Sequence, residues 1–343
     1  MEIKEMLFNL CRLNGPSGFE EAVSAYCAEI LAEYSPEVRV DRLGNVLAAI
    51  PCGKPGAKKM LLDAHIDELG LIVTAVEQGF LRFETLGGID PRMLPGREVT
   101  ILTNPPLFGV VSCLPPHVLT PEQMEKTIPL KDMYIDVGLS EEEAKKRIPI
   151  GTPAVYRDEP RELENHILCG KALDDRACFV ALVQALDKLK GKNLNIDLFV
   201  AAGVQEEVFM RGAGPLAYTV DPDYCIVVDV THAATPDSKG QVTCKFGGGP
   251  VLSIGPNADR RFTQFIQDTA GKRNIPYQLE VHTRNSGTNA YPIQVSRGGV
   301  ITAIMGVPLR YLHSPVECAK LEDIEKAAEL LAAVLETMPE EVI

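Results

Sequence analysis

Residues 196-IDLFVAAGVQEEVFMRGAG-214 join a strongly apolar segment to two adjacent glutamates, Glu206 and Glu207. The apolar part is typical of a strand that is buried on both faces of a parallel sheet. An ionised carboxylate at the end of such a strand must be paired or bound to a metal, because its removal from water is otherwise too costly. The stretch therefore predicts a buried sheet with a polar site at the end of one strand.

Strand and helix signals alternate on both sides of this stretch. Strands are predicted at residues 37–41, 45–50, 60–65, 194–203, 224–230 and 298–306. Helices are predicted at residues 2–13, 18–34, 175–190, 211–219, 258–272 and 320–338. Ser17 and Glu20 have the spacing of a capping box at the start of the second helix. The alternation favours an α/β fold with a central, mainly parallel sheet covered on both faces.

The segment between about residues 71 and 163 has a different pattern. Short β-rich stretches lie at 71–76, 80–85, 97–102, 108–113 and 133–138, with turn residues between them. This spacing suits a small β-barrel or sandwich. Ser140 and Glu143 are placed to cap a short acidic helix within it. We therefore predict a discontinuous α/β domain of residues 1–69 and 164–343, interrupted by an inserted β-barrel domain of residues 70–163.

Composition excludes several classes of partner. The 343-residue chain has a net charge of −13, which argues against a nucleic-acid partner and against an anionic membrane surface. No uncharged apolar run is long enough to span a bilayer, and the first residues lack the features of a secretory signal. The nine cysteines are scattered and form no Cys-x-x-Cys pair, which is typical of buried thiols in a reducing compartment. We expect a soluble cytoplasmic protein.

Five stretches place an acidic residue or a histidine just beyond an apolar segment. They are 63-DAHIDELG-70, 170-GKALDDRA-177, the Glu206-Glu207 pair, 227-VVDVTHA-233 and 310-RYLHSPVE-317. In open α/β sheets, ligands bind outside the carboxyl ends of the strands. Two histidines with several carboxylates and no thiolate suit zinc, cobalt or manganese. Because carboxylates outnumber imidazoles, two divalent ions bridged by one carboxylate are favoured.

Each stretch also has an explanation without a metal. His65 is favoured as a ligand because Asp67, two residues on, can hold its second ring nitrogen. The Asp174-Asp175 pair could instead cap a helix, where negative charge is favourable. Asp229 could be a turn residue, although its position at the end of a buried strand favours a function. His313 alone is a weak signal.

The remaining four histidines have no comparable setting, and we predict that they are not ligands. They are His117, His166, His232 and His282. His117 differs from the others because a loop of the inserted segment could reach the site of a neighbouring subunit.

Taken in order, AHIDELG, GKALDDRA, GVQEEVFMRGA, VVDVTHA and RYLHSPVE resemble the co-catalytic metallo-aminopeptidases of the glutamyl aminopeptidase and tetrahedral aminopeptidase family. Some members of that family carry the name endoglucanase. The stretches 14-NGPSGFE-20 and 246-FGGGPVL-252 fit the same family, and the resemblance covers nearly the whole chain. It implies a zinc-peptidase α/β domain with an inserted β-barrel used in oligomerisation, giving assemblies from dimers to dodecamers.

The resemblance also implies a role for each site residue. His65 would bind one metal ion, His313 the other, and Asp174 would bridge them. Glu207 and Asp229 would each complete the shell of one ion. Glu206 would be the general base toward a metal-activated water, and Asp67 would orient His65. The implied activity is the removal of N-terminal residues from short peptides with two divalent ions, zinc or cobalt before manganese.

Two positions depart from the family pattern. Asn289, in 286-SGTNA-290, stands where an Asp is usual, and could alter recognition of the substrate's free amine. Phe209 stands where a Gly is common, and its ring could narrow a pocket or simply pack. Asn289 is the one feature that supports a catalytically altered homologue acting as a scaffold or binding protein. A second alternative is a related metal-dependent hydrolase, either a deacylase or an enzyme of the kind named endoglucanase. Glutamyl, leucyl and lysyl preferences all stay open.

Overall fold

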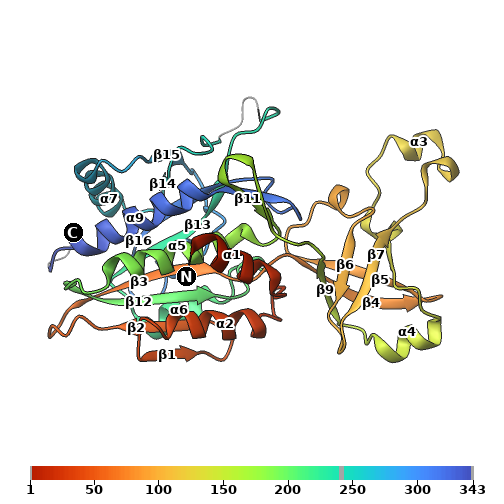
Figure 1. Cartoon of the computed structure of the whole chain (residues 1–343), viewed down its shortest axis with the longest axis horizontal. Helices are drawn as coiled ribbons and strands as arrows, with labels where there is room; N and C mark the ends of the chain where they lie inside the picture. The colour runs from red at the N-terminus through yellow and green to blue at the C-terminus, as the bar shows by residue number, and fades with distance from the viewer. Residues whose placement is uncertain (1, 239–242, 341–343) are drawn as a thin grey trace.

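A mixed sheet forms the centre of the larger part of the molecule in the computed structural model, which describes residues 2–238 and 243–340 (Figure 1). Within those residues it has 11 strands, nine of them in the order β1-β2-β12-β3-β13-β16-β17-β11-β10. In that order they are Glu37–Val40, Val46–Ile50, Ile196–Gly203, Lys58–His65, Tyr224–His232, Ile301–Arg310, Glu317–Lys320, Ile167–Gly170 and Arg161–Leu163. β14 (Val251–Ile254) pairs with β16 and with β15 (Gln278–Val281).

The four central strands, β12, β3, β13 and β16, are parallel, as the alternating sequence pattern predicts. The short outer strands β1, β2, β17, β11 and β10 run antiparallel to their neighbours. Because the central strands run in one direction, their carboxyl ends meet at one edge of the sheet. This edge is where an open α/β sheet binds its ligands.

Helices cover both faces of this sheet. On one face the core contains side chains of α1 (Ile3–Arg12), α2 (Glu21–Leu31), α5 (Leu173–Leu189), α7 (Arg260–Arg273) and α9 (Leu321–Thr337). On the other face a smaller core contains side chains of α6 (Ala213–Val220) and α8 (Ala290–Gln294). Successive residues of β3 divide between the two cores, since Leu61 packs in the smaller one and Leu62 in the larger one.

The chain leaves the sheet after β3 and forms a closed barrel that projects from its side (Figure 1). The strands around the barrel follow the order β4-β5-β8-β7-β6-β9. They are Gly70–Glu77, Phe80–Leu86, Tyr134–Asp136, Leu107–Ser112, Glu98–Ile101 and Pro153–Tyr156. The barrel has an apolar core of its own. The predicted inserted β-barrel is therefore confirmed as a fold, whereas the limits 70 and 163 stay predictions.

Two short helices lie in the same segment. α4 (Glu141–Arg147) begins with the predicted capping box of Ser140 and Glu143. α3 (Pro121–Met124) lies at the far end of the barrel from the sheet (Figure 1).

The capping box predicted at Ser17 is wrong. Helix α2 begins only at Glu21, and Gly18 before it has a φ of +88°, which is not helical. The Ser17 hydroxyl instead donates a hydrogen bond to the Asp67 carboxylate at 2.6 Å. Ser17 therefore contacts the segment that follows β3 and does not cap α2. The Glu20 carboxylate accepts hydrogen bonds from the backbone N–H groups of Gly18 and Gln205. Contacts between distant segments thus replace the local cap.

All nine cysteines are free, in agreement with the prediction that they form no disulfide framework. Among the helices of the described residues, none combines the length and the apolar character needed to cross a membrane.

Arg176 fastens helix α5 to the N-terminal helix and to the end of β3. Its guanidinium is fully buried and donates hydrogen bonds to the backbone carbonyls of Ile66, Leu10 and Leu13 at 2.7–3.0 Å. Its second terminal nitrogen lies 3.4 Å from the Glu68 carboxylate. A buried guanidinium needs this full set of acceptors, because each lost partner leaves a polar group without water.

We expect Arg176→Met to lower the free energy of unfolding by about 3–5 kcal/mol, because it removes a buried donor from three backbone carbonyls and from the Glu68 carboxylate. Urea denaturation followed by circular dichroism measures the change. Arg39→Met is the matched control, since Arg39 is exposed on β1. Equal midpoints for the two variants would contradict the anchoring role of Arg176.

Candidate metal centre

Five chain segments converge at the carboxyl edge of the central strands. His65 is the last residue of β3 and lies opposite Gly203, the last residue of β12. The remaining predicted site residues come from the segment just after β3, the turn after β12, the second half of β13, the start of α5 and the loop after β16. They are Asp67, Glu206, Glu207, Asp229, Asp174 and His313. The structure brings all the predicted residues together.

Asp174 lies between the two histidines. Its Oδ1 is 3.1 Å from His65 Nε2, and its Oδ2 is 3.4 Å from His313 Nε2. The backbone torsions of Asp174 are not helical, and no side chain caps α5. The alternative that this aspartate only caps a helix is therefore not favoured.

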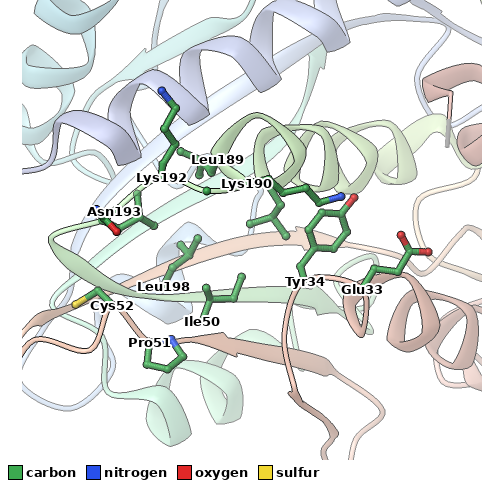
Figure 2. Close-up of a pocket in the computed structure, with 13 residues that line it drawn as sticks. Glu33, Tyr34, Ile50, Pro51, Cys52, Leu189, Lys190, Lys192, Asn193 and Leu198 are labelled. Atoms are coloured by element: carbon green, nitrogen blue, oxygen red, sulfur yellow. The ribbon is translucent and has the colours of Figure 1, made fainter.

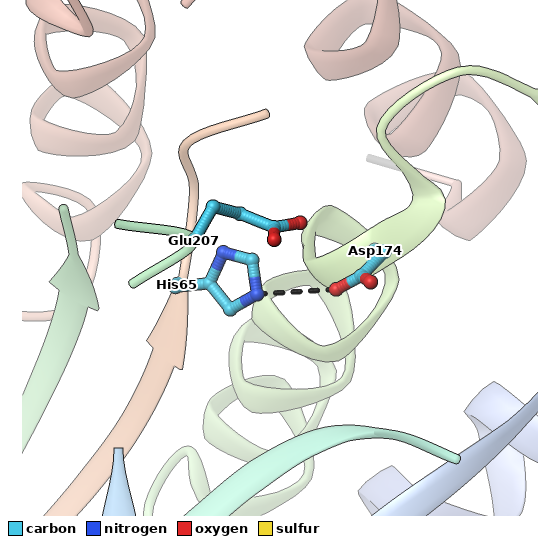
Figure 3. A group of neighbouring side chains, drawn as sticks. All are labelled: His65, Asp174 and Glu207. Carbon is cyan, nitrogen blue, oxygen red and sulfur yellow. Dashed lines mark hydrogen bonds and ion pairs between the residues drawn. The ribbon is translucent and has the colours of Figure 1, made fainter. Parts of the chain in front are cut away.

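Glu207 completes a first group of ligand atoms. It joins His65 and Asp174 (Figure 3). Each of the three residues offers one ligand atom, and these atoms lie within 4.8 Å of one another. Glu207 Oε2 also lies 3.6 Å from His313 Nε2. His313 Nδ1 lies 3.2 Å from the carbonyl oxygen of Gly88, which follows barrel strand β5. Because a carbonyl can only accept, Nδ1 carries a proton, which leaves Nε2 as the nitrogen that can bind a metal ion.

A second group joins His65 to Asp175 and Asp229, again with ligand atoms within 4.8 Å. Asp175 is fully buried, and its Oδ2 accepts a hydrogen bond from the His65 backbone at 3.2 Å. Asp175 was seen in the sequence only as half of an acidic pair, so its proximity to Asp229 was missed.

Asp67 holds the loop that carries the two glutamates. Its carboxylate accepts hydrogen bonds from the backbone N–H groups of Glu206 at 3.0 Å and Glu207 at 3.2 Å. The hydroxyl of Ser17 donates to the same carboxylate, and His65 Nδ1 lies 3.3 Å from it. A single buried carboxylate therefore sets both the ring of His65 and the position of the loop.

Glu317 supports the opposite side of the site and was also missed in the sequence. It accepts hydrogen bonds from the backbone N–H groups of Asp174 and His313, both at 3.0 Å. Its position four residues after His313 was the available signal.

Burial dominates the electrostatics of the acidic groups. It raises the pKa of Glu206 to about 9, that of Glu207 to about 8 and that of Asp229 to about 7. Burial also acts on Asp174, but contacts with His313 and His65 outweigh it and lower the pKa of this carboxyl. The Asp174 contact raises the pKa of His313 to about 10. Protons thus provide the positive charge that the cluster requires in the absence of another cation.

The donor set fits divalent metal ions. Both groups combine imidazole with carboxylate, and neither contains a cysteine. Two buried oxygens, Oδ1 of Asp175 and Oε1 of Glu206, have no hydrogen-bond partner among the described residues. Such atoms need an ion or water, because a buried polar atom without a partner is costly.

A cavity of about 240 Å³ opens directly on this cluster. His65, Asp174, Glu206, Asp229 and His313 form one part of its lining. The site therefore has room for a small ligand next to the grouped carboxylates.

A second hollow of about 360 Å³ lies near the beginning of β12, at the opposite end of the sheet (Figure 2). Lys190 Nζ lies 4.5 Å from the ring centroid of Tyr34, and the Tyr34 hydroxyl donates to Asp187. Among described residues, its lining includes one carboxylate, Glu33, and no histidine. None of its lining residues belongs to a metal-ligand group of the described residues, so the cavity at the carboxyl edge is the better candidate.

The two departures from the family pattern have structural accounts. Phe209 has a φ of +69°, a region that favours glycine, and is 86% exposed. The expectation that its ring narrows a pocket or packs is therefore wrong within this chain. Asn289 is buried, and its amide donates a hydrogen bond to the buried Asp63 at 2.8 Å. A neutral amide avoids placing two carboxylates in contact there.

The four remaining histidines divide into two pairs. His117 and His166 are exposed, and neither belongs to a metal-ligand group of the described residues. His232 and His282 also lie outside those groups, but both line the cavity. The sequence did not reveal this, although His232 lies in the fourth of the five stretches, three residues after Asp229, whereas His282 lies outside all five.

Comparisons with known proteins agree with the arrangement. A family model described as M42 glutamyl aminopeptidase matches residues 44–330. A lysyl aminopeptidase from Pyrococcus furiosus is 34% identical, over 97% of each chain. The crystal structure of a TET aminopeptidase from the marine sediment archaeon Thaumarchaeota archaeon SCGC AB-539-E09 has a TM-score of 0.92 and 33% identity, covering 98% of this chain and 97% of that one.

A further solved structure is similar over 98% of this chain and 100% of its own. It is the TET1 peptidase of Pyrococcus horikoshii, which can assemble into a tetrahedron or a large octahedral shell. Its TM-score is 0.85 at 32% identity.

We expect Asp67→Asn to weaken divalent-metal binding by about 10- to 100-fold, because an amide cannot accept from both loop N–H groups and from Ser17 while facing His65. Competition with a chelating dye measures the affinity. Asp268→Asn, on the exposed side of α7, is the control. Unchanged affinity in Asp67→Asn would show that its carboxylate does not position the site.

Proposed function

The chain belongs to the M42 glutamyl aminopeptidase family and is a peptide hydrolase of the aminopeptidase class; from that premise we propose that it removes N-terminal residues from short peptides with the help of two divalent metal ions. One observation carries the proposal: the two oxygens of Asp174 face the Nε2 atoms of two different histidines. A carboxylate in this position can bridge two ions.

The ligands follow from the distances around Asp174. His65 with Asp229 would hold one ion, and His313 with Glu207 would hold the other. The grouping of His65 with Asp229 and the 3.6 Å separation of His313 from Glu207 support this division. Zinc and cobalt accept such a set most readily, and manganese is compatible with it.

When bound, the two ions polarise the scissile carbonyl and lower the pKa of the attacking water. Glu206 acts as the general base, taking a proton from that water and passing it to the leaving amine. Its side chain is 8% exposed, lines the cavity and has one unpaired oxygen among the described residues. The adjacent Glu207 is placed as a ligand by its distance of 3.6 Å from His313 Nε2. Asp67 positions both glutamates through their backbone.

A catalytically altered homologue that serves as a scaffold is less favoured. That alternative rested on Asn289, whose amide pairs with Asp63 and does not line the cavity. The proposed base and all five proposed ligands are present. A related deacylase is likewise less favoured, because the family match extends over residues 44–330.

We further propose that the barrel of residues 70–163 mediates self-association, as the resemblance implies. Exposed apolar side chains on its outer loops support this, among them Leu114, Val118 and Met124. The P. horikoshii relative assembles into large shells. His117 belongs to the same loops, and its approach to a neighbouring site is part of this proposal. The free cysteines are consistent with a cytoplasmic location.

The activity is tested on a panel of aminoacyl-p-nitroanilides after dialysis against a chelator and return of zinc, cobalt or manganese. We expect metal-restored release of nitroaniline. Glu206→Gln should keep its bound metal and lose about 10²–10⁴-fold in kcat, because only the proton acceptor is removed. Glu207→Gln should lose metal affinity as well.

Metal content by elemental analysis separates the two variants, and each serves as the control for the other. Near-normal turnover in Glu206→Gln would contradict its role as the base. Metal-loaded protein that cleaves no substrate of the panel would contradict the aminopeptidase activity.

Replacing Leu114 and Val118 with serine together should reduce the molar mass of the assembly, because it removes apolar area from the barrel loops. Size-exclusion chromatography with light scattering measures the mass. Val295→Ser, at an exposed position of the α/β part, is the control. An unchanged mass in the double variant would contradict the role of the barrel.

A further inference from the structure

The cavity beside the metal centre has a second acidic wall. Strand β15 contributes Glu280, and the neighbouring β14 contributes Ser253. Both residues line the same cavity of about 240 Å³ as His65 and Glu206. A substrate whose scissile bond lies at the metal centre therefore has Glu280 within the same enclosed space.

Glu280 is held in a fixed orientation. Its Oε2 accepts a hydrogen bond from the Thr231 hydroxyl at 2.7 Å, and its Oε1 accepts one from the Ser253 hydroxyl at 2.8 Å. His282 Nε2 lies 3.0 Å from the same Oε1. The side chain is only 12% exposed. A carboxylate that is already ordered and shielded from water loses little entropy when it binds a partner.

The lining of the cavity contains several carboxylates but no lysine or arginine side chain among the described residues. Apart from Glu280, these carboxylates belong to the metal centre described above and are Asp174, Glu206 and Asp229. Glu280 is thus the one carboxylate of the described lining that lies outside that centre. An acidic substrate side chain would meet repulsion here, with no fixed cation to offset it.

We propose that Glu280 determines specificity by binding the positively charged side chain of a lysine or arginine at the N-terminus of the peptide. The proposal rests on the proposed aminopeptidase function and names the substrate class of the same site. A hydrogen bond between an ammonium or guanidinium group and a carboxylate is among the strong ones, particularly where water is largely excluded. The Thr231 and Ser253 hydroxyls keep the carboxylate in place for this contact.

The test compares lysyl- and norleucyl-p-nitroanilide on the metal-loaded enzyme, since norleucine resembles lysine without its ammonium group. We expect kcat/KM to favour lysyl over norleucyl by about 10- to 100-fold, and Glu280→Gln to abolish most of that ratio. Gln keeps the size of the side chain: its amide oxygen can accept from one of the two hydroxyls, and its NH2 group can donate to the oxygen of the other. The glutamyl substrate should be the poorest of the panel.

His282→Gln is the matched control in the same cavity, and it should keep the preference for lysine because the Glu280 carboxylate remains. Equal kcat/KM for lysyl and norleucyl substrates would overturn the proposal. So would an unchanged ratio in Glu280→Gln, or an equal loss of the ratio in His282→Gln.

Binding of free L-lysine and L-norleucine to the metal-loaded protein, measured by calorimetry, separates this proposal from the proposed function. Tighter binding of lysine, lost in Glu280→Gln, would support the role of Glu280 even if no peptide substrate were cleaved. Equal binding of the two amino acids by the wild-type chain would overturn it, whatever the catalytic activity. The comparison of lysine with norleucine on the wild-type chain does not require that any variant folds.

Discussion

The positions of the site residues depend on the contacts of one buried carboxylate, that of Asp67. It accepts from the backbone of Glu206 and Glu207 and from the hydroxyl of Ser17, and it lies 3.3 Å from His65 Nδ1. Three segments that are far apart in the sequence are therefore fixed by one buried anion. Because both glutamates are held through their backbone, their side chains stay free for chemistry.

Two buried charge clusters lie side by side and are balanced differently. Glu68 contacts Lys171 at 2.6 Å and Arg176 at 3.4 Å, so this cluster contains its own cations. Around Asp174 and Glu207, the ion pairs of the described residues involve only histidines. The first cluster is complete when the chain folds, whereas the second obtains its balancing charge from solution. A bound metal ion would therefore add to the stability of the site as well as supply its chemistry.

The features that could be predicted from the sequence are those that hydrophobic periodicity and the residues at strand ends reveal. The central parallel strands, the barrel and the convergence of the site residues followed from buried apolar runs that end in acids or histidines. The Ser17 cap was wrong because a tertiary partner, Asp67, outcompeted the local backbone. Glu317 and Glu280 were missed because their roles come from strand pairing. Nothing local in 278-QLEV-281 shows that β15 forms a wall of the cavity.

The contact of His313 Nδ1 with the carbonyl of Gly88 has a consequence for how the molecule moves. Gly88 lies in the barrel segment, and His313 lies in the loop after β16. A rotation of the barrel against the sheet would move the carbonyl that orients this imidazole. Neighbouring subunits that hold the barrel in place would therefore also restrict a proposed metal ligand. In such an assembly, one carbonyl oxygen would link the contact between subunits to the geometry of the reaction centre.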